Sequence, residues 1–249
     1  MGWRLAHIFR HPIKAHGRQE LAHVALSEGR CLPFDRHWAV AHEAARLRDG
    51  WNPCMNFTRG AKTPALQAIS AQMDDATGQI TLTHPARPPL TFAPDTAQGQ
   101  ADFLNWVAPL MAGGRAQPVR LVTAGRGMTD TDFESVSILN LASNRVLGKR
   151  LGRNLGLDRW RGNLWLDGLA PWEEFDLLDR ELAIGDARLK IVERITRCRA
   201  TMVDCATGRI DVDTLAELDA GYGHTDFGVY AIVTRGGTIR AGDRPELCA

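Results

Sequence analysis

The chain has 249 residues, of which 44% are hydrophobic and 24% are charged. These are the proportions of a globular protein of one or two domains, and they exclude a disordered or fibrous chain. The formal net charge of +1 gives no global field that would attract nucleic acid or an anionic membrane. Since no stretch reaches the roughly 20 apolar residues of a membrane span, we expect a cytoplasmic protein with no membrane or nucleic-acid partner.

The first part of the chain predicts short β-strands. Runs of apolar and β-branched residues are separated by Gly, Pro and Asp, as in a barrel or a sandwich. The runs are residues 3–9, 19–26, 37–41, 66–71 and 79–83. A proline cluster at 85–94 interrupts this pattern, and we place a boundary near residue 96, with a smaller β-rich domain at 1–96 and a second domain at 97–249.

Helical spacing of apolar residues appears after this boundary. It predicts helices at 103–111, at 137–151, where serines at the start and cations at the end suit the helix dipole, and at 213–220. Strands are predicted at 187–195 and 229–234, the second followed by a Gly-Gly turn and a last strand. The chain is therefore predicted to be mainly β with a few helices.

The five cysteines are scattered and form no C-x-x-C pair, so they predict neither a disulfide framework nor structural zinc. Cys198 stands between Arg197 and Arg199 at the end of a predicted strand. Two neighbouring guanidinium groups favour the thiolate, which is both a nucleophile and a soft metal ligand. The alternative is a small apolar side chain in the core, a common place for a free cysteine.

Other positions are candidates for binding an anion. A helix N-terminus with hydroxyl groups and nearby cations holds phosphate well. Each candidate also has a structural interpretation as a cap, an ion-pair partner or a solvated charge. The candidates are Lys14, Arg36, Ser135, Arg161 and Asn163.

A carboxylate pair, Glu173 and Glu174, has two interpretations. The pair supplies general acid and base groups, or it forms the first turn of a helix, where negative charge complements the dipole. The chain contains no phosphate-binding glycine loop, dinucleotide fingerprint, serine-hydrolase elbow or zinc-protease motif. The usual nucleotide-dependent and hydrolase classes therefore have no support.

Several segments, in order along the chain, resemble the MOSC family, which is named for the C-terminal domain of molybdenum cofactor sulfurases. They are HPIK at 11–14, FDRHWAV at 34–40, SVSILN at 135–140, DRWRGNL at 158–164, WEE at 172–174, RCRATMVDCATG at 197–208 and FGVY at 227–230. The resemblance covers nearly the whole chain and extends to the β-rich N-terminal domain of the amidoxime-reducing members. It implies a β-barrel MOSC domain preceded by that smaller domain, and no pyridoxal-phosphate desulfurase domain.

The resemblance also implies a cofactor and an activity. Cys198 would be the protein's ligand to a molybdenum ion carried by a pterin dithiolene, the molybdenum cofactor. The implied reaction is the reduction of N-hydroxylated or N-oxide-type substrates, with electrons from a separate ferredoxin-like or flavin protein. The alternative is a sulfur or cofactor carrier that holds a persulfide on Cys198. The residues implied to hold the pterin phosphate and ring are Lys14, Arg36, Ser135, Arg161 and Asn163, with Arg197 beside the metal ligand.

Two departures from the family pattern affect these expectations. Cys205 stands where the family usually has proline, so we expect a second thiol near Cys198 that is a candidate resolving thiol. The segment at 51–59 matches only loosely, and we expect it to border the substrate mouth. We expect the electron donor to dock on a basic patch. The alternative interpretation of the same residues is a solvated helix end whose charges complement the helix dipole. The members of this patch are Arg145, Lys149, Arg150, Arg153 and Arg159.

Overall fold

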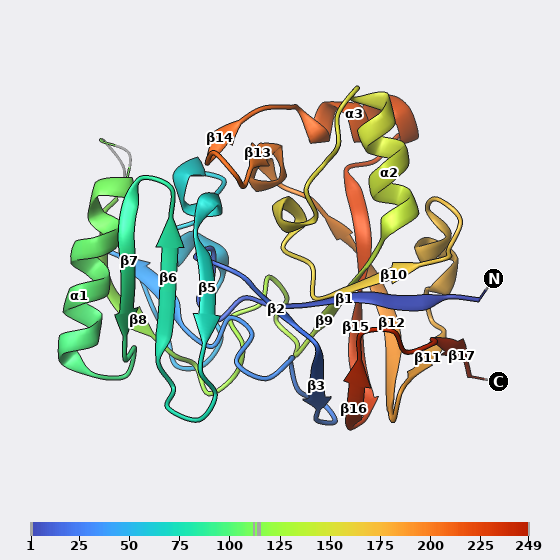
Figure 1. Cartoon of the computed structure of the whole chain (residues 1–249), viewed down its shortest axis with the longest axis horizontal. Helices are drawn as coiled ribbons and strands as arrows, with labels where there is room; N and C mark the ends of the chain where they lie inside the picture. Colours follow the sequence, from blue (N-terminus) through green and yellow to red (C-terminus); the bar gives the residue numbers. More distant parts are fainter. Residues whose placement is uncertain (1, 112, 114–115, 249) are drawn as a thin grey trace.

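The computed structural model describes residues 2–111, 113 and 116–248, and it shows two lobes (Figure 1). The larger lobe is built on an eight-stranded sheet in the order β17-β11-β12-β15-β9-β10-β1-β2. The prediction of a mainly β chain with a few helices is confirmed. The strands of this sheet are β1 Arg4–Arg10, β2 Gln19–Leu21, β9 Val136–Asn140, β10 Leu164–Asp167, β11 Glu181–Ile184, β12 Ala187–Thr196, β15 Asp226–Arg235 and β17 Glu246–Leu247.

The smaller lobe combines a three-stranded sheet, a two-stranded sheet and a helix. The elements are β5 Ser70–Met73, β6 Ile80–His84, β7 Arg87–Phe92, β4 Ala39–His42, β8 Pro118–Val122 and α1 Ala97–Val107. Phe103, Trp106 and Val107 of α1 are buried in the same core as Ile80 and Leu82 of β6. The helix that follows the predicted boundary near residue 96 therefore packs on the N-terminal strands.

Two predictions for this lobe are wrong in detail. The proline cluster does not break the structure, because Pro88 and Pro89 lie within β7. This strand pairs with β6 at the edge of the sheet, where a missing N–H removes no ladder hydrogen bond. The strand predicted at 66–71 is mainly a 3-10 helix, η2 (Pro64–Ala68), and β5 begins only at Ser70. Pro64 stands at the start of η2, where proline is favoured.

The helix predicted at 137–151 is a strand followed by a helix. Its first residues form β9, and α2 spans Leu141–Arg150. All five residues of β9 are buried, and β10 and β15 pair with it on either side. A short, mostly apolar run does not distinguish strand from helix by periodicity. Asn140 ends β9 and caps α2, since its side chain accepts a hydrogen bond from Ala142 N at 2.8 Å.

The N-terminal strands join the two lobes. β1 pairs antiparallel with β10 in the large sheet, and β3 (His23–Leu26) pairs with β16 (Gly237–Arg240) near the end of the chain. The loops that follow β1 therefore run from the large sheet into the small lobe. The remaining elements are β13 Val203–Asp204, β14 Arg209–Ile210, α3 Thr214–Tyr222 and the 3-10 helices η1 Cys54–Asn56, η3 Ala108–Leu110, η4 Leu157–Trp160, η5 Glu173–Leu177 and η6 Arg199–Met202. In the described part of the chain, no helix has the length and apolar character needed to span a membrane.

Candidate functional site

A cavity of about 320 Å³ is lined by residues of both lobes. The small lobe contributes Cys54 and Gln67, and the large lobe contributes Cys198 and Tyr230. Among the described residues that line it, Asp130 is the one carboxylate. Six cationic side chains also line the cavity, namely Lys14, Arg36, Arg59, Arg159, Arg161 and Arg197.

Lys14 reaches the cavity from the loop after β1. A parallel bridge between Ile13 and Trp38 holds this loop, and Lys14 N donates to Trp38 O at 2.8 Å. The Lys14 Nζ atom donates to Met128 O at 2.7 Å and to Asp130 Oδ1 at 2.5 Å. Lys14 is buried, so its charge is held in one position beside Asp130.

Arg36 lies in a turn against the same loop. Its φ of +51° is left-handed, and its N–H donates to His11 O at 2.6 Å. The guanidinium forms an ion pair with Asp35 and donates through Nη2 to Arg161 O at 2.8 Å. Burial opposes ionisation of Asp35, but the charge of Arg36 outweighs it and holds the pKa of Asp35 well below its usual range. The positive charge of Arg36 is thus largely neutralised within the protein.

Arg161 carries a charge that the protein does not neutralise. It ends η4 in the left-handed region, with φ +50° and ψ +39°, and its Nη2 lies 3.4 Å from Ile13 O. No ion-pair partner of Arg161 is present in the described ranges. Desolvation in the cavity, followed by repulsion from Arg36, lowers the pKa of Arg161 to about 9. An anion in the cavity would reverse this shift, because it stabilises the protonated guanidinium.

Arg197 and Cys198 follow the end of β12. The Arg197 side chain donates through Nε to Phe227 O and through Nη1 to Trp160 O, both at 2.8 Å. Burial lowers the pKa of Arg197 to about 10. Cys198 is exposed, precedes η6 and lines the cavity. Its position excludes the alternative of a thiol packed in the core.

Two of the predicted residues do not line the cavity. Ser135 is buried, with its hydroxyl 2.8 Å from that of Thr131. Asn163 is buried behind Ser137 and accepts hydrogen bonds from the Ser137 hydroxyl at 2.8 Å and from its backbone N–H at 3.1 Å. Ser137 itself lines the cavity, so Asn163 is a positioning residue for Ser137 in this geometry.

The sequence did not single out several lining residues. Tyr230 lies opposite Ser137 in the β9–β15 pair, and burial raises its pKa to about 12. Gln67 donates through Nε2 to Ala200 O at 3.1 Å and so connects η2 to η6. Nothing in the local sequence marks Tyr230, Gln67 or Asp130 as site residues, because each reaches the cavity through tertiary packing alone.

Two candidate groups are buried and do not line the first cavity. Desolvation raises the pKa of the Cys205 thiol to about 12, which disfavours the thiolate form, and its role as a resolving thiol stays a prediction. Glu174 is fully buried in η5, where it accepts hydrogen bonds from Asn140 Nδ2 and Ser143 Oγ, both at 2.8 Å. It does not line the cavity, which favours its structural interpretation. The second cavity thiol is Cys54, in the predicted mouth segment 51–59.

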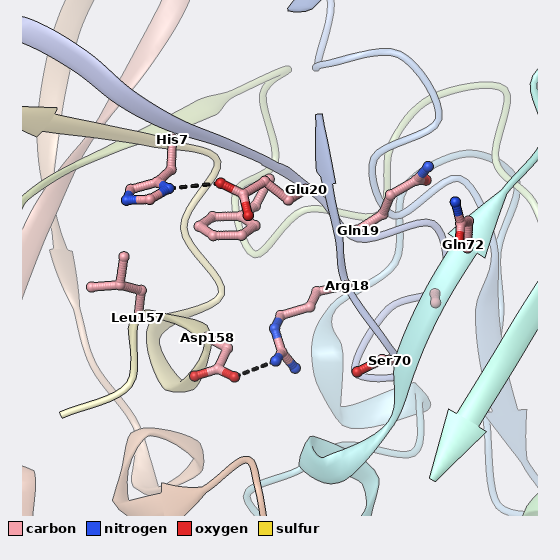
Figure 2. Close-up of a pocket in the computed structure, with 10 residues that line it drawn as sticks. His7, Arg18, Gln19, Glu20, Ser70, Gln72, Leu157 and Asp158 are labelled. Carbon is pink, nitrogen blue, oxygen red and sulfur yellow. Dashed lines mark hydrogen bonds and ion pairs between the residues drawn. The ribbon is translucent and has the colours of Figure 1, made fainter. Parts of the chain in front are cut away.

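A second cavity, of about 470 Å³, lies on the other side of η4 (Figure 2). His7 Nδ1 lies 2.6 Å from Glu20 Oε1 in this cavity, and Arg18 forms an ion pair with Asp158 at 2.5 Å. None of the predicted site residues lines the second cavity. The pair of Arg18 and Asp158 ties η4 to the loop before β2, which helps to fix Trp160 and Arg161 in the first cavity.

The first cavity suits an anionic cofactor that itself supplies most of the donor atoms to a bound metal ion. In the described part of the chain, no group of three or more His, Cys, Asp or Glu side chains is placed to hold a metal ion. Two buried polar atoms of lining residues, Gln67 Oε1 and Arg159 Nε, have no hydrogen-bond partner in that part. The exposed thiol can complete the coordination of a soft metal. The cations beside it can bind the phosphate of a cofactor.

Comparison with known proteins supplies a family. A model of the MOSC N-terminal beta barrel domain matches residues 2–116, and a model of the MOSC domain matches residues 126–246. The mitochondrial amidoxime-reducing component 1 of Mus musculus is 25% identical over 96% of this chain and 80% of its own length. The mitochondrial amidoxime reducing component 2 of Bos taurus is 32% identical over 45% of this chain, but the match spans only 36% of that protein. Among solved structures, the YUAD protein from Bacillus subtilis aligns with 99% of this chain and 96% of its own at 11% identity and a TM-score of 0.49.

Proposed function

This chain belongs to the MOSC family, and from that membership we propose that it binds the molybdenum cofactor in the cavity between the lobes and reduces N-hydroxylated or N-oxide-type substrates. The observation that carries the proposal is the exposed thiol of Cys198 in a cavity with six cationic side chains. The similarity to amidoxime-reducing components supports the reaction class.

The lining residues fit this cofactor. Cys198 supplies a thiolate ligand, which suits a soft metal. Lys14 and Arg161 lie where they would hold the pterin phosphate, and Arg161 has no carboxylate partner of its own in the described ranges. Ser135 and Asn163, implied by the family resemblance, would act through Thr131 and Ser137 rather than by direct contact.

The cofactor, when bound, supplies the two-electron redox change, and the protein supplies the surroundings. Removal of oxygen from an N–OH group consumes two electrons and two protons and releases water. Arg197 is held by the carbonyl groups of Phe227 and Trp160, so it keeps a positive charge beside the thiolate. The chain contains no dinucleotide fingerprint or cysteine spacing for an iron–sulfur cluster, so the proposal includes a separate electron-donor protein.

Metal analysis tests the binding proposal. Protein purified from a host that makes the cofactor should contain molybdenum, and Cys198→Ser should remove most of it and its visible absorption while the circular dichroism spectrum stays unchanged. Cys248→Ser, a thiol away from the cavity, is the matched control and should keep the metal. Wild-type molybdenum content in Cys198→Ser would contradict the ligand assignment.

The exposure of Cys198 also favours a second candidate, a sulfur or cofactor carrier. Protein that releases thiocyanate on treatment with cyanide, in proportion to a persulfide on Cys198, and that contains no stable molybdenum would support this candidate. Turnover of an aryl amidoxime with reduced methyl viologen, but not with NADH alone, would support the reductase.

A further inference from the structure

The donor-docking patch expected on α2 and the following loop is partly paired with acidic side chains of this chain. Arg145 pairs with Asp167 at 3.3 Å, and Arg150 pairs with Glu217 at 2.5 Å. Two more of its five members, Arg153 and Arg159, share Asp211 at 3.6 and 3.2 Å, and Arg159 is buried. Lys149 is exposed and has no ion pair in the described part of the chain. The other four cations of this patch are tied to carboxylates of the same chain, which leaves them less free to pair with an acidic partner.

A different group of cations belongs to segments that border the cavity. Lys62, Arg199 and Arg209 are all exposed, and we call them the cationic rim. In the described ranges no carboxylate lies within ion-pair distance of any of the three. The carboxylate on the same hairpin, Asp204, accepts hydrogen bonds from Thr207 and the backbone of Ala206 instead.

The local contacts bring the cationic rim together. Lys62 follows Ala61, which lines the cavity, and Arg199 follows Cys198. The turn between β13 and β14 lies on η2, since a Cβ at Gly208 would come within 3.0 Å of the backbone of Ala65. Figure 1 shows β13 and β14 beside the upper end of β5, where the chain of the small lobe reaches the large lobe. Arg209, which follows Gly208, is thereby placed beside η2, the 3-10 helix whose Gln67 lines the cavity.

Large apolar side chains are exposed on segments that border the cavity or carry the cationic rim. Met55, which follows the cavity-lining Cys54, is 65% exposed, and Ile210 of β14 is 49% exposed. Large apolar side chains next to unpaired charges are typical of a protein-binding surface. Exposed cations that are not paired within their own protein complement an acidic partner and accelerate its approach.

We propose that the cationic rim, with Met55 and Ile210, is the docking surface for an acidic electron-transfer protein whose redox centre lies at its own surface. The inference rests on the proposed reductase function, because a reductase that holds a single redox group must receive its electrons from another protein. A protein bound on this face has direct access to Cys198, the exposed thiol at the proposed metal. A one-electron donor docks twice in each turnover to deliver the two electrons that the reduction consumes.

Charge reversal with two electron donors tests the proposal. The rim variant carries Lys62→Glu and Arg209→Glu and leaves Arg199, the neighbour of Cys198, unchanged. The control variant carries Lys190→Glu and Arg240→Glu, which change the net charge equally on β12 and β16. The donors are a reduced plant-type ferredoxin, which is acidic, and reduced methyl viologen, a small cation that needs no docking surface. The substrate is an aryl amidoxime.

We expect the rim variant to lose at least about tenfold in the rate constant with ferredoxin at low salt, and the control variant to stay within about threefold of the wild type. Both variants should keep the wild-type rate with viologen and the wild-type molybdenum content. A rim variant with an unchanged ferredoxin rate, or an equal loss in both variants, would overturn the docking surface.

Binding of oxidised ferredoxin, measured by calorimetry at low salt, gives a second readout that needs no turnover. If no protein turns over the amidoxime with viologen, the proposed reductase function fails, and the docking surface is then judged by binding alone. Equal affinity of wild type and rim variant would overturn it, whereas a loss confined to the rim variant would support it.

Discussion

Two arginines of the cavity differ in how the protein treats their charge. Arg36 is buried and paired with Asp35, a carboxylate that is itself fully buried. Arg161 has no such partner in the described part of the chain, and the nearby charge of Arg36 repels it. The guanidinium of Arg36 is therefore paired within the protein, whereas that of Arg161 has no ion-pair partner in the described ranges and is proposed to meet a ligand.

This difference predicts opposite effects of two alanine substitutions on the cofactor-free protein. Arg36→Ala leaves Asp35 as an unpaired buried charge and should lower the free energy of unfolding by about 3 kcal/mol. Arg161→Ala removes a repelled cation and should change it by less than about 1 kcal/mol. Urea unfolding of both proteins, expressed without the cofactor, measures these values.

The cofactor-loaded protein provides the second half of the comparison. Arg161→Ala should lower molybdenum occupancy, because a hydrogen bond to an ionised partner contributes about 1.5 to 3 kcal/mol. Arg161→Lys keeps a cation at this position and should restore part of the occupancy. Full occupancy in Arg161→Ala, or a loss of stability equal to that of Arg36→Ala, would show that Arg161 is structural.

At the scale of elements, the junction of β9 and α2 depends on Asn140. Its Oδ1 atom caps α2, and its Nδ2 atom donates to Ala170 O at 2.7 Å and to Glu174 Oε2 at 2.8 Å. One fully buried side chain thus connects a strand, a helix and the loop before η5. This junction aims Ser137 of β9 into the cavity while α2 packs on the other side.

Asn140→Ala should lower the free energy of unfolding by about 3 kcal/mol, because it removes a cap worth about 1 kcal/mol and two buried hydrogen bonds of similar size. The exposed Asn154 offers a matched control, and Asn154→Ala should change the stability by less than about 0.5 kcal/mol. Thermal and urea unfolding measure both. Equal midpoints for the two variants would mean that the junction does not depend on Asn140.

The joint between the lobes makes the whole molecule sensitive to acid. His11 and His16 lie in the loop that follows β1 and are fully buried. His16 contacts Lys14 O through Nδ1 at 2.7 Å and packs against Phe103 of α1. Burial lowers the pKa of His11 to about 3 and that of His16 to about 4. Both rings are therefore neutral in the folded protein at neutral pH.

These lowered pKa values predict that stability falls as the pH falls. Between about pH 6.5 and 4 the unfolded chain binds a proton at His16 that the folded protein does not bind, which costs up to about 1.4 kcal/mol per pH unit. Below pH 4 this contribution to the slope ends. His16→Asn should flatten the pH dependence of the urea midpoint in this window, whereas His23→Asn, at an exposed site, should not.

Glu174 acts in the opposite direction, because burial raises its pKa and the folded protein takes up that proton first. Glu174 is present in the wild type, in His16→Asn and in His23→Asn. The difference between their slopes of urea midpoint against pH therefore isolates the contribution of His16. An identical slope in wild type and His16→Asn would contradict the prediction.

Local patterns were enough to predict most strands and the main site candidates. Period-two alternation placed β1, β6 and β15, because each has one face in a core. The residues around Cys198 and Arg161 were found because the family resemblance rests on contiguous motifs. Lys14, Arg36, Arg161, Arg197 and Cys198, from four separate segments, line one cavity. Their roles toward a cofactor stay a prediction.

Only the tertiary structure decided how these segments meet. The mostly apolar sequence of β9 also fits a helix, but pairing with β10 and β15 on either side makes it a strand. The prolines of β7 suggest a break in the structure, but a strand at the edge of a sheet accommodates them. Long-range ion pairs tie four cations of the expected docking patch to carboxylates, whereas the members of the proposed cationic rim have no ion pair in the described part of the chain. Tyr230 and Gln67 reach the cavity through strand register and lobe packing. Motifs and periodicity are local properties of the chain, whereas the burial, pairing and neutralisation of a side chain depend on residues far from it in sequence.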